Sequence, residues 1–435
     1  MLLPASRPPI GSRLALDACL DFDFARMRGQ VAGVGVSLES IIVEARSGPA
    51  LTAGPGGFFR TKAAGVPRFA HRWNGAGRGL QVENAATNLI KYSADLTQTA
   101  WTKSTGASAS IWNWPIAPDG ASPVCLLNDT QPLSSSPGVA SQSVTIANDG
   151  YPTVASIYVY PGSQTKIGLT LALSGGTGVT AYGYFDLTEG VCYSISNVAS
   201  VNIERAAGGY FRLQVAAQNN SSGNTTATLT IGRAGASVSP GYFWIWGAQC
   251  EYNVMSASSP IATTNATASR VADLPYYPLG SILAPYQDTI YVEAELQASE
   301  GDQPILLLCN NSLTESVNIF RQNSSGSLLG VAVSSNTTQA TFTAAGCTAP
   351  PGGIIRAAFS FTQNAFQFAA RTYTNDYTGA QNAVLTASSG NVSPALFTNA
   401  YFGGGPYRNP GGVFISRFVV FPSFLQGNDL SDLIA

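Results

Sequence analysis

The segment YPTVASIYVY, residues 151–160, alternates its side chains with a period of two and ends at the turn sequence PGS, residues 161–163. The segment KIGLTLAL, residues 166–173, repeats this pattern and ends in SGGTG, residues 174–178. A period of two predicts β-strands, because successive side chains of a strand point to opposite faces of a sheet. Short strands with turns at this spacing predict an antiparallel β-sandwich of the jelly-roll type over residues 86–275.

Two further parts flank this region. A second β-rich unit is expected over residues 276–435, where residues 288–296 and 353–361 have the composition of strands. The first 85 residues contain a short alternating stretch, LDFDF at 20–24, and a density of Gly and Pro that excludes long helices. The sequence therefore predicts an all-β chain in which an extended N-terminal arm, residues 1–85, precedes two antiparallel sandwiches.

The composition restricts the classes of function. Hydrophobic residues make up 45% of the 435 residues, which is enough for real cores, whereas charged residues make up only 11%. The usual charged share is about 25%, so the surface must consist largely of uncharged polar side chains. The formal net charge of −2 argues against nucleic acid as a partner, because phosphate binding needs a basic footprint.

The residues that bind metals or carry redox chemistry are sparse. A single histidine, His71, excludes a histidine-cluster metal site, and six scattered cysteines without a C-x-x-C pair argue against a zinc ribbon or a redox motif. We expect buried thiols rather than disulfides, no cofactor and no metal. The first residues lack the apolar segment of a signal peptide, and no apolar run is long enough for membrane insertion.

Two long blocks of sequence resemble a known family. The first is GLQVENAATNLIKYSADL at residues 79–96, closed by AWTK at 100–103; the second is GYFWIWGAQCE at 241–251, followed by SSPIAT at 258–263 and ASRVAD at 268–273. In this order they resemble virion structural proteins of tailed bacteriophages and gene transfer agents, of the head spike, head fibre, tail fibre or baseplate type. The resemblance implies that residues 86–275 form a jelly roll like that of carbohydrate-binding modules.

The end of the chain resembles a second fold family. The strand ISRFVVFPSFL at residues 415–425, followed by NDLSDL at 428–433, is similar to the closure of concanavalin-like and laminin-G-like sandwiches. The resemblance implies that residues 276–435 form such a sandwich.

Catalytic candidates are few. Glu293 and Glu295 share one face of a predicted strand, as the carboxylates of concanavalin-like glycosidases do, but Ala298 stands where a third acid would be expected. We interpret these glutamates, like Asp21 and Asp23, as a polar row of a strand. His71 would have to serve any serine nucleophile as its base, and nothing in its surroundings suggests a triad. We therefore expect no catalytic residue.

Aromatic residues are better candidates for binding, because the apolar faces of sugars stack on Trp and Tyr. Trp112 and Trp114 are two positions apart, which on a strand would point both rings the same way. Tyr182 and Tyr184 have the same spacing. These four residues are the candidates for glycan stacking, whereas Trp101 and Trp246 are expected to belong to the core.

The sequence thus leads to a virion component, assembled in the cytoplasm of a bacterial host, that binds host-surface polysaccharide without cleaving it. Its expected partners are other virion proteins, bound through the N-terminal arm, and further copies of itself. Two alternatives stay open at this stage: a glycan-active enzyme on the same fold, and a purely architectural connector or decoration protein without a glycan site.

Overall fold

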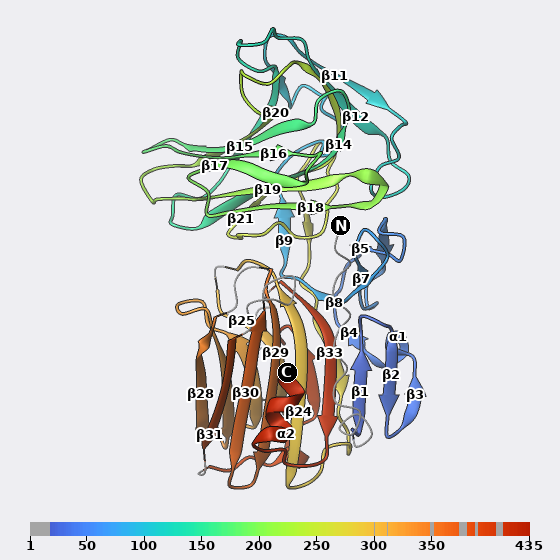
Figure 1. The fold of residues 1–435 in the computed structure, drawn as a ribbon, viewed down its shortest axis with the longest axis vertical. Coiled ribbons are helices and arrows are strands. Elements are labelled where there is room, and N and C mark those ends of the chain that lie inside the picture. The colour runs from blue at the N-terminus through green and yellow to red at the C-terminus, as the bar shows by residue number, and fades with distance from the viewer. Residues whose placement is uncertain are drawn as a thin grey trace.

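The computed structural model describes residues 18–299, 301–310, 312–348, 352–373, 381–387, 390–405 and 412–435. Strands dominate these ranges (Figure 1), and the helices within them are short: α1 (Leu38–Ile41), α2 (Asn428–Ile434) and the 3₁₀ turns η2 (Ala207–Gly209) and η3 (Pro394–Leu396). The strands pair in antiparallel ladders. The all-β fold with two antiparallel sandwiches is confirmed.

The first sandwich consists of two six-stranded sheets. One sheet has the order β10 (Thr102–Lys103), β13 (Val139–Thr145), β20 (Thr226–Arg233), β15 (Lys166–Ser174), β16 (Val179–Asp186) and β17 (Val191–Ser196). The other has the order β11 (Ala107–Trp112), β12 (Val124–Asp129), β21 (Gly241–Tyr252), β14 (Pro152–Pro161), β19 (Phe211–Gln218) and β18 (Ser200–Arg205).

The alternation of these strands builds their common core. Leu169 and Phe185 from the first sheet pack in one cluster with Ile157 and Phe243 from the second, and Trp101 is buried among them. The opposite side chains of the same strands point away from the core and form the outer faces of the sandwich.

The second sandwich is larger. One sheet runs β3 (Val34–Val36), β2 (Arg28–Val31), β1 (Leu20–Asp23), β33 (Val413–Phe421), β24 (Gln287–Leu296), β29 (Ile354–Thr362), β30 (Phe366–Tyr373) and β31 (Gln381–Ala387), with β7 (Phe69–His71) and β8 (Gly77–Val82) attached to it. The facing sheet runs β28 (Thr337–Thr348), β27 (Ser327–Ser334), β26 (Ser316–Arg321), β25 (Gln303–Cys309), β32 (Asn399–Phe402), β23 (Pro275–Pro278) and β4 (Val43–Glu44). The hairpin β5 (Ala50–Ala53) and β6 (Phe59–Lys62) forms a small separate sheet.

Most of the described part of the first 85 residues belongs to the second sandwich, which corrects the expectation of a separate N-terminal arm; the β5–β6 hairpin instead places Phe59 against Tyr158 of the first sandwich, with ring centroids 5.6 Å apart. Strand β1 pairs with β33 on one side and with β2 on the other, and its Leu20 and Phe22 are fully buried in the core. The physical reason is that β33 would otherwise present an open edge next to a large apolar core. An attachment role for this segment stays a prediction, and residues 1–17 lie outside the described residues.

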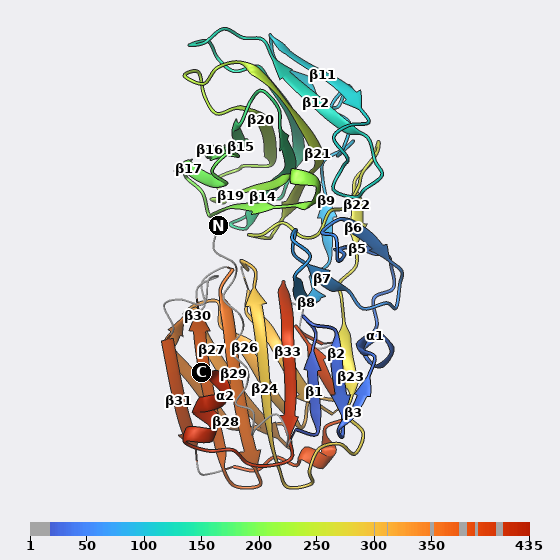
Figure 2. The same cartoon turned by 45° about the vertical axis from the view of Figure 1, so that its right-hand side comes forward.

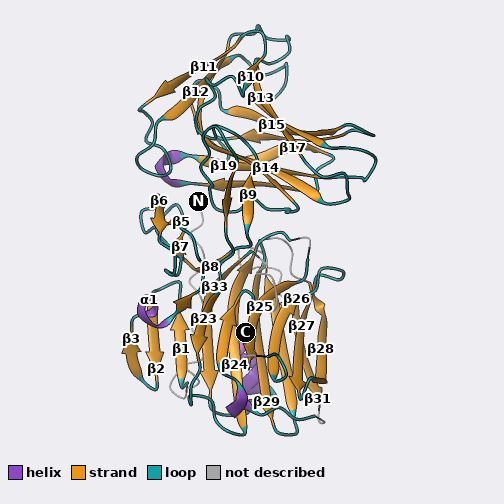
Figure 3. Ribbon diagram, turned by 180° about the vertical axis from the view of Figure 1, so that it is seen from behind, coloured by secondary structure: helices purple, strands orange, loops and turns teal. Residues whose placement is uncertain are grey.

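The first sandwich is therefore inserted into the second. The chain leaves the second sandwich after β8, enters the first through β9 (Ala86–Asn88), and returns through β22 (Ala268–Arg270) to β23. The two crossing segments pair with each other, Ala86 opposite Arg270. Figure 2 shows β9 and β22 side by side between the two sandwiches, and Figure 3 shows the same junction from behind.

Candidate functional site

Two tyrosines lie side by side on the outer face of the first sandwich. In β16 the residues Ala181, Gly183 and Phe185 are buried, so Tyr182 and Tyr184 point outward. Their ring centroids are 4.7 Å apart and their ring planes differ by 31°. Both side chains are half-buried, so each ring lies against the sheet and still meets solvent. The spacing in the sequence correctly placed this pair on one face.

A glycine beneath Tyr184 gives its ring room to lie against the sheet. Gly168 on β15 is the cross-strand partner of Tyr184. A Cβ added at Gly168 would lie 3.2 Å from the Tyr184 ring, which is closer than ordinary van der Waals contact. A Cβ at Gly235 would lie 3.7 Å from the hydroxyl end of the same ring. Any side chain at position 168 would therefore push the ring away from the sheet.

Hydroxyl side chains flank the two rings. Tyr182 stands between Ser196 on β17 and Thr170 on β15, and Thr170 is in turn opposite Thr230 on β20. Ser194 lies opposite Tyr184. Cross-strand partners share a face, so these hydroxyls surround the rings. In the part of the chain that the structure describes, their side chains have no protein hydrogen-bond partner and can bind a ligand.

The edge strand β17 adds a third ring and a charge pair. The Tyr193 ring centroid lies 6.3 Å from that of Tyr184, and Lys166 Nζ lies 5.7 Å from the Tyr193 ring. Lys166 also approaches Asp186 Oδ2 at 3.9 Å. Burial raises the pKa of Tyr184, with a smaller contribution from Tyr182, so its hydroxyl stays neutral and can donate a hydrogen bond. Sequence reasoning missed Tyr193 because the register shifts in β17 next to it.

Below, the name tyrosine platform denotes the residues Tyr182, Tyr184, Tyr193, Thr170, Ser194, Ser196 and Thr230. Its chemistry suits a saccharide, because the rings provide apolar surface while the surrounding hydroxyls donate and accept hydrogen bonds.

Trp112 and Trp114 lie at the end of a strand and just beyond it. Trp112 is the last residue of β11, is 47% exposed, and donates a hydrogen bond from Nε1 to Ser110 Oγ at 2.9 Å. Trp114 is 57% exposed and lies beyond the strand, with its ring edge-on to Trp244 at 5.2 Å and to Tyr160 at 5.9 Å. Trp112 is the cross-strand partner of Val124, which belongs to the same outer-face cluster as Trp244, so both tryptophans lie on the outer face of this sheet although β11 ends between them.

The surroundings of the two tryptophans differ from those of the tyrosine platform. Ile111 and Ile116, the apolar neighbours of the tryptophans along the chain, are also exposed. The Ser110 hydroxyl beside Trp112 already accepts a hydrogen bond from its ring, whereas the platform hydroxyls have no protein partner among the described residues. The tryptophan surface is therefore the second candidate site for glycan binding, after the tyrosine platform.

The two candidate carboxylates are held by separate arginines. Glu293 is buried, accepts a hydrogen bond from Arg356 Nε at 3.0 Å and another from Ser416 Oγ at 2.8 Å. Glu295 accepts from Arg72 Nη2 at 2.6 Å and from Arg78 Nη2 at 2.5 Å. The expectation of a solvent-facing polar row is wrong for Glu293, because the face of β24 around Glu293 is covered by Arg356 and by the end of the chain.

The other acid and base candidates also have structural surroundings. Asp21 accepts hydrogen bonds from Arg417 at 2.7 Å and 3.0 Å, and Asp23 accepts one from Arg26 at 2.8 Å. His71 lies at the end of β7, and its buried Nδ1 has no hydrogen-bond partner among the residues that the structure describes.

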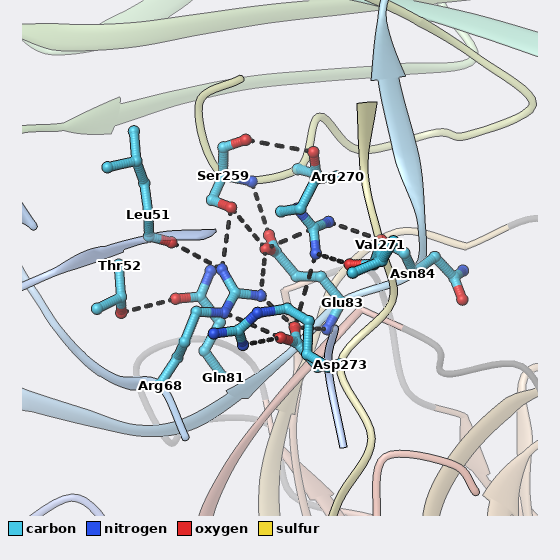
Figure 4. Close-up of polar contacts among 12 residues, drawn as sticks. Leu51, Thr52, Arg68, Gln81, Glu83, Asn84, Ser259, Arg270, Val271 and Asp273 are labelled. Carbon is cyan, nitrogen blue, oxygen red and sulfur yellow. Dashed lines mark hydrogen bonds and ion pairs between the residues drawn. The ribbon is translucent and has the colours of Figure 1, made fainter. Parts of the chain in front are cut away.

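The two sequence blocks meet at the junction between the sandwiches. Arg68 donates from Nη2 to Glu83 Oε2 at 2.8 Å and also binds Asp273, while Arg270 Nη2 lies 3.5 Å from Glu83 (Figure 4). Ser259 donates to Glu83 from its backbone N and from Oγ, both at 2.7 Å. Burial alone would raise the pKa of Glu83, but the charges of Arg270 and Arg68 hold it well below its usual range.

The same blocks anchor the crossing strands to the first sandwich. Asn88 Nδ2 donates to the carbonyls of Ala248 at 3.0 Å and Ile261 at 2.9 Å, and its Oδ1 accepts from the backbone N of Cys250 at 3.1 Å. Gln249 Oε1 accepts from the backbone N of Ile261 at 2.9 Å. The most recognisable residues of the sequence therefore hold the two sandwiches together.

Within the described part of the chain, the six cysteines form no disulfide. Burial raises the pKa of Cys250 to about 12, which makes this thiol unreactive. Within the described ranges, no group of three or more His, Cys, Asp and Glu side chains could hold a metal ion, and no helix is long and apolar enough to span a membrane.

Comparison with known proteins gives a weak result. No family model matches the chain, and no curated protein matches it. Among solved structures, the tandem CBM22 domains of Xyn10C from Paenibacillus barcinonensis match 81% of this chain and 96% of their own, with 11% identity and a TM-score of 0.27. The CBM40 of an IT-sialidase from Ruminococcus gnavus, bound to α2,6-sialyllactose, matches 37% of this chain and 92% of its own, with 16% identity and a TM-score of 0.29.

The LG1–3 region of the laminin α2 chain matches 67% of this chain and 65% of its own, with 10% identity and a TM-score of 0.26. Sequence identities and TM-scores this low say nothing about which ligand this chain binds or what activity it has. The functional argument therefore rests on its own residues.

Proposed function

We propose that this protein is a non-enzymatic adhesin that binds surface polysaccharide through the tyrosine platform. The observation that carries the proposal is the pair Tyr182 and Tyr184, whose rings lie 4.7 Å apart against the sheet among unpaired hydroxyls. The C–H faces of one or two sugar rings would stack on the tyrosines. Thr170, Ser194 and Ser196 would bind the sugar hydroxyl groups.

Binding without cleavage is part of the proposal. Glycoside hydrolysis needs two carboxyl groups flanking the scissile bond, one of them able to donate a proton. The best candidates, Glu293 and Glu295, are both engaged by arginines, and Arg78 and Arg72 lower the pKa of Glu295 against the effect of its burial. Among the described residues, the acidic side chain beside the tyrosine platform is Asp186, whose Oδ2 lies 3.9 Å from Lys166 Nζ.

We further propose that the protein acts as a component of a phage or phage-like particle, in a spike or fibre. The support is the order and length of the two sequence blocks, together with their shared role at the junction of the sandwiches. A shallow site on a sheet face gives weak binding per copy, and display of many copies on one particle would raise the avidity by about 10²–10⁴ without new contacts. The segment before residue 86 is proposed to contact other virion proteins.

The test uses the purified protein and immobilised polysaccharide from the host surface. Replacing both Tyr182 and Tyr184 by Ala should weaken binding by about 1–3 kcal/mol for each stacked ring, a value taken from nucleobase stacking. Tyr151→Ala is the matched control, because Tyr151 is an exposed tyrosine of the same sandwich outside the platform. Equal loss in both proteins, or release of oligosaccharide from the polysaccharide, would contradict the proposal.

A further inference from the structure

A line of hydroxyl side chains crosses the outer face of the first sandwich from one edge of a sheet to the other. It begins in the tyrosine platform on β17 and β16, which lie next to β15 (Figure 1), and continues over β20 and β13 to β10. The cross-strand pairing aligns one residue from each strand. In this order the residues are Ser196, Tyr182, Thr170, Thr230, Ser141 and Thr102, called the hydroxyl row below.

The alternation of the strands turns the hydroxyl row toward solvent. On β20, for example, Leu229 and Ile231 are fully buried in the core, so Thr230 between them points outward. Thr102 is exposed and the other members of the row are half-buried. Among the residues that the structure describes, no protein group forms a hydrogen bond with a hydroxyl of the row. These hydroxyls can therefore bind a ligand.

An apolar ridge borders the hydroxyl row on one side. Tyr184 and Val139 belong to the adjacent cross-strand row, and the residues between them are Gly168 and Gly232. A Cβ at Gly168 would lie 3.2 Å from the Tyr184 ring, and a Cβ at Gly232 would lie 2.7 Å from Val139 Cγ1. The tyrosine ring and the valine side chain thus lean over the two glycines. They form an apolar border that suits the C–H faces of sugar rings.

The row on the other side consists of small uncharged residues. They are Thr180, Ala172, Thr228 and Ser143, in the order of the strands from β16 to β13. The hydroxyls of Ser143 and Thr228 are bonded to each other at 2.9 Å. None of the three adjacent rows contains a charged residue. An acidic ligand would therefore find no cation along the hydroxyl row, whereas a neutral ligand would find hydroxyls beside an apolar border.

The hydroxyl row is long enough for several sugars. Neighbouring strands are about 4.7–4.9 Å apart, so the six strands span roughly 24 Å from the first to the last. One strand spacing is similar to the length of one sugar in an extended chain, which gives about one sugar per strand. A single chain can also follow the twist of the sheet, which rotates each strand by about 20–25° relative to its neighbour.

We propose that the hydroxyl row binds a linear, uncharged polysaccharide chain that runs across the strands from the tyrosine platform toward β10. The inference rests on the proposed adhesin function and specifies the class of polysaccharide and its direction. A sugar at one end of the bound segment stacks on Tyr182 and Tyr184. The sugars that follow exchange hydrogen bonds with Thr230, Ser141 and Thr102.

The dependence of affinity on chain length tests the proposal in the unmodified protein. The probes are oligosaccharides of cellulose, amylose, mannan and chitin, from disaccharide to octasaccharide, titrated into the full chain in NMR or calorimetric experiments. In at least one series the hexasaccharide should bind about tenfold or more tightly than the disaccharide, because each added hydrogen bond contributes about two- to tenfold. Oligomers of galacturonate, which have the same lengths but carry charge, should bind more weakly than that series.

Thr230→Val combined with Ser141→Ala removes hydroxyls of the row outside the tyrosine pair. This variant should weaken binding of the hexasaccharide about fourfold or more and leave binding of the disaccharide unchanged, because the disaccharide occupies the tyrosines. Thr226→Val combined with Thr145→Ala is the matched control, since these residues pair on the same face of the same two strands, two rows away. A loss of fold would weaken both ligands and is thereby distinguished.

Equal affinity for hexasaccharide and disaccharide would overturn the hydroxyl row and leave the tyrosine platform, and with it the proposed function, intact. An unchanged ratio of the two affinities in Thr230→Val with Ser141→Ala would also overturn it, as would equally tight binding of the galacturonate oligomers. If no neutral series binds, the hydroxyl row is overturned, while the proposed function is decided separately by the substitutions of Tyr182 and Tyr184 on host-surface polysaccharide.

Discussion

The Tyr184 ring lies directly over Gly168, its cross-strand partner on β15, and a Cβ at that glycine would come within 3.2 Å of the ring. This relationship explains how a half-buried tyrosine can present a face on an otherwise polar sheet. It also makes position 168 a means of changing the platform without removing any of its aromatic rings.

Gly168→Ala should therefore weaken polysaccharide binding severalfold while the protein stays folded. The added methyl group displaces the Tyr184 ring from the sheet, and the substitution requires no unusual backbone angle. Binding to immobilised polysaccharide measures the effect. Gly35→Ala on β3 is the matched control, since a Cβ there would meet nothing within 4 Å. Full binding by Gly168→Ala would show that the ring position is unimportant.

Trp112→Ala combined with Trp114→Ala should lower polysaccharide binding less than alanine at Tyr182 and Tyr184 does. The tryptophans are exposed, but the Ser110 hydroxyl beside Trp112 already accepts a hydrogen bond from its ring. The same binding assay ranks the two pairs of substitutions. A larger loss from the tryptophan pair would move the principal site to that surface.

Much of the fold follows from local pattern, and the platform tyrosines are the clearest case. The alternation in residues 182–186 correctly placed Tyr182 and Tyr184 on the outer face, because β16 continues through both positions. For Trp112 and Trp114 the local pattern did not show that β11 ends at Trp112, which leaves Trp114 beyond the strand. Where a strand stops depends on its partners, which the local sequence does not contain.

Long-range pairing accounts for the remaining differences. Leu20 pairs with Val420, 400 positions later in the numbering, and nothing in the segment around Leu20 specifies that partner. Likewise, the spacing of Glu293 and Glu295 says nothing of Arg356, Arg72 and Arg78, which bind them from other strands and loops.

Asp273→Asn should destabilise the protein by about 3–5 kcal/mol, because it leaves buried arginines without their counter charge. Asp273 binds both Arg46, at 2.7 Å, and Arg68, and it is fully buried at the junction. Thermal or urea unfolding measures the loss. Glu39→Gln, which breaks an exposed pair with Lys62, should cost at most about 1 kcal/mol. Similar small effects from both substitutions would contradict a structural role for the network.

Asp288 should make stability depend on pH. Burial raises its pKa to about 8, and its buried Oδ2 has no hydrogen-bond partner in the described ranges. Because the folded-state pKa lies above the unfolded value of 3.8, the unfolded chain loses this proton first as the pH rises. The free energy of unfolding is therefore undiminished by Asp288 below the unfolded pKa, and it falls as the pH rises toward about 8.

Asp288→Asn should therefore stabilise the protein relative to the unmodified chain at pH 9, by an amount on the order of a few kcal/mol, and much less at pH 4. Urea unfolding at the two pH values measures the difference. Asn can still accept the hydrogen bond from Ala284 N, which is 3.1 Å long in the structure. An equal effect at both pH values would show that Asp288 does not titrate as described.

The most direct test of the central claim is a crystal structure of the protein grown with oligosaccharides released from the host-surface polysaccharide. The account predicts a sugar ring stacked on Tyr182 or Tyr184, with its carbons about 3.5–4.0 Å from the ring carbons and its hydroxyls bonded to Thr170, Ser194 or Ser196. A bound oligosaccharide that leaves the tyrosine platform empty and occupies another surface of the first sandwich would contradict it.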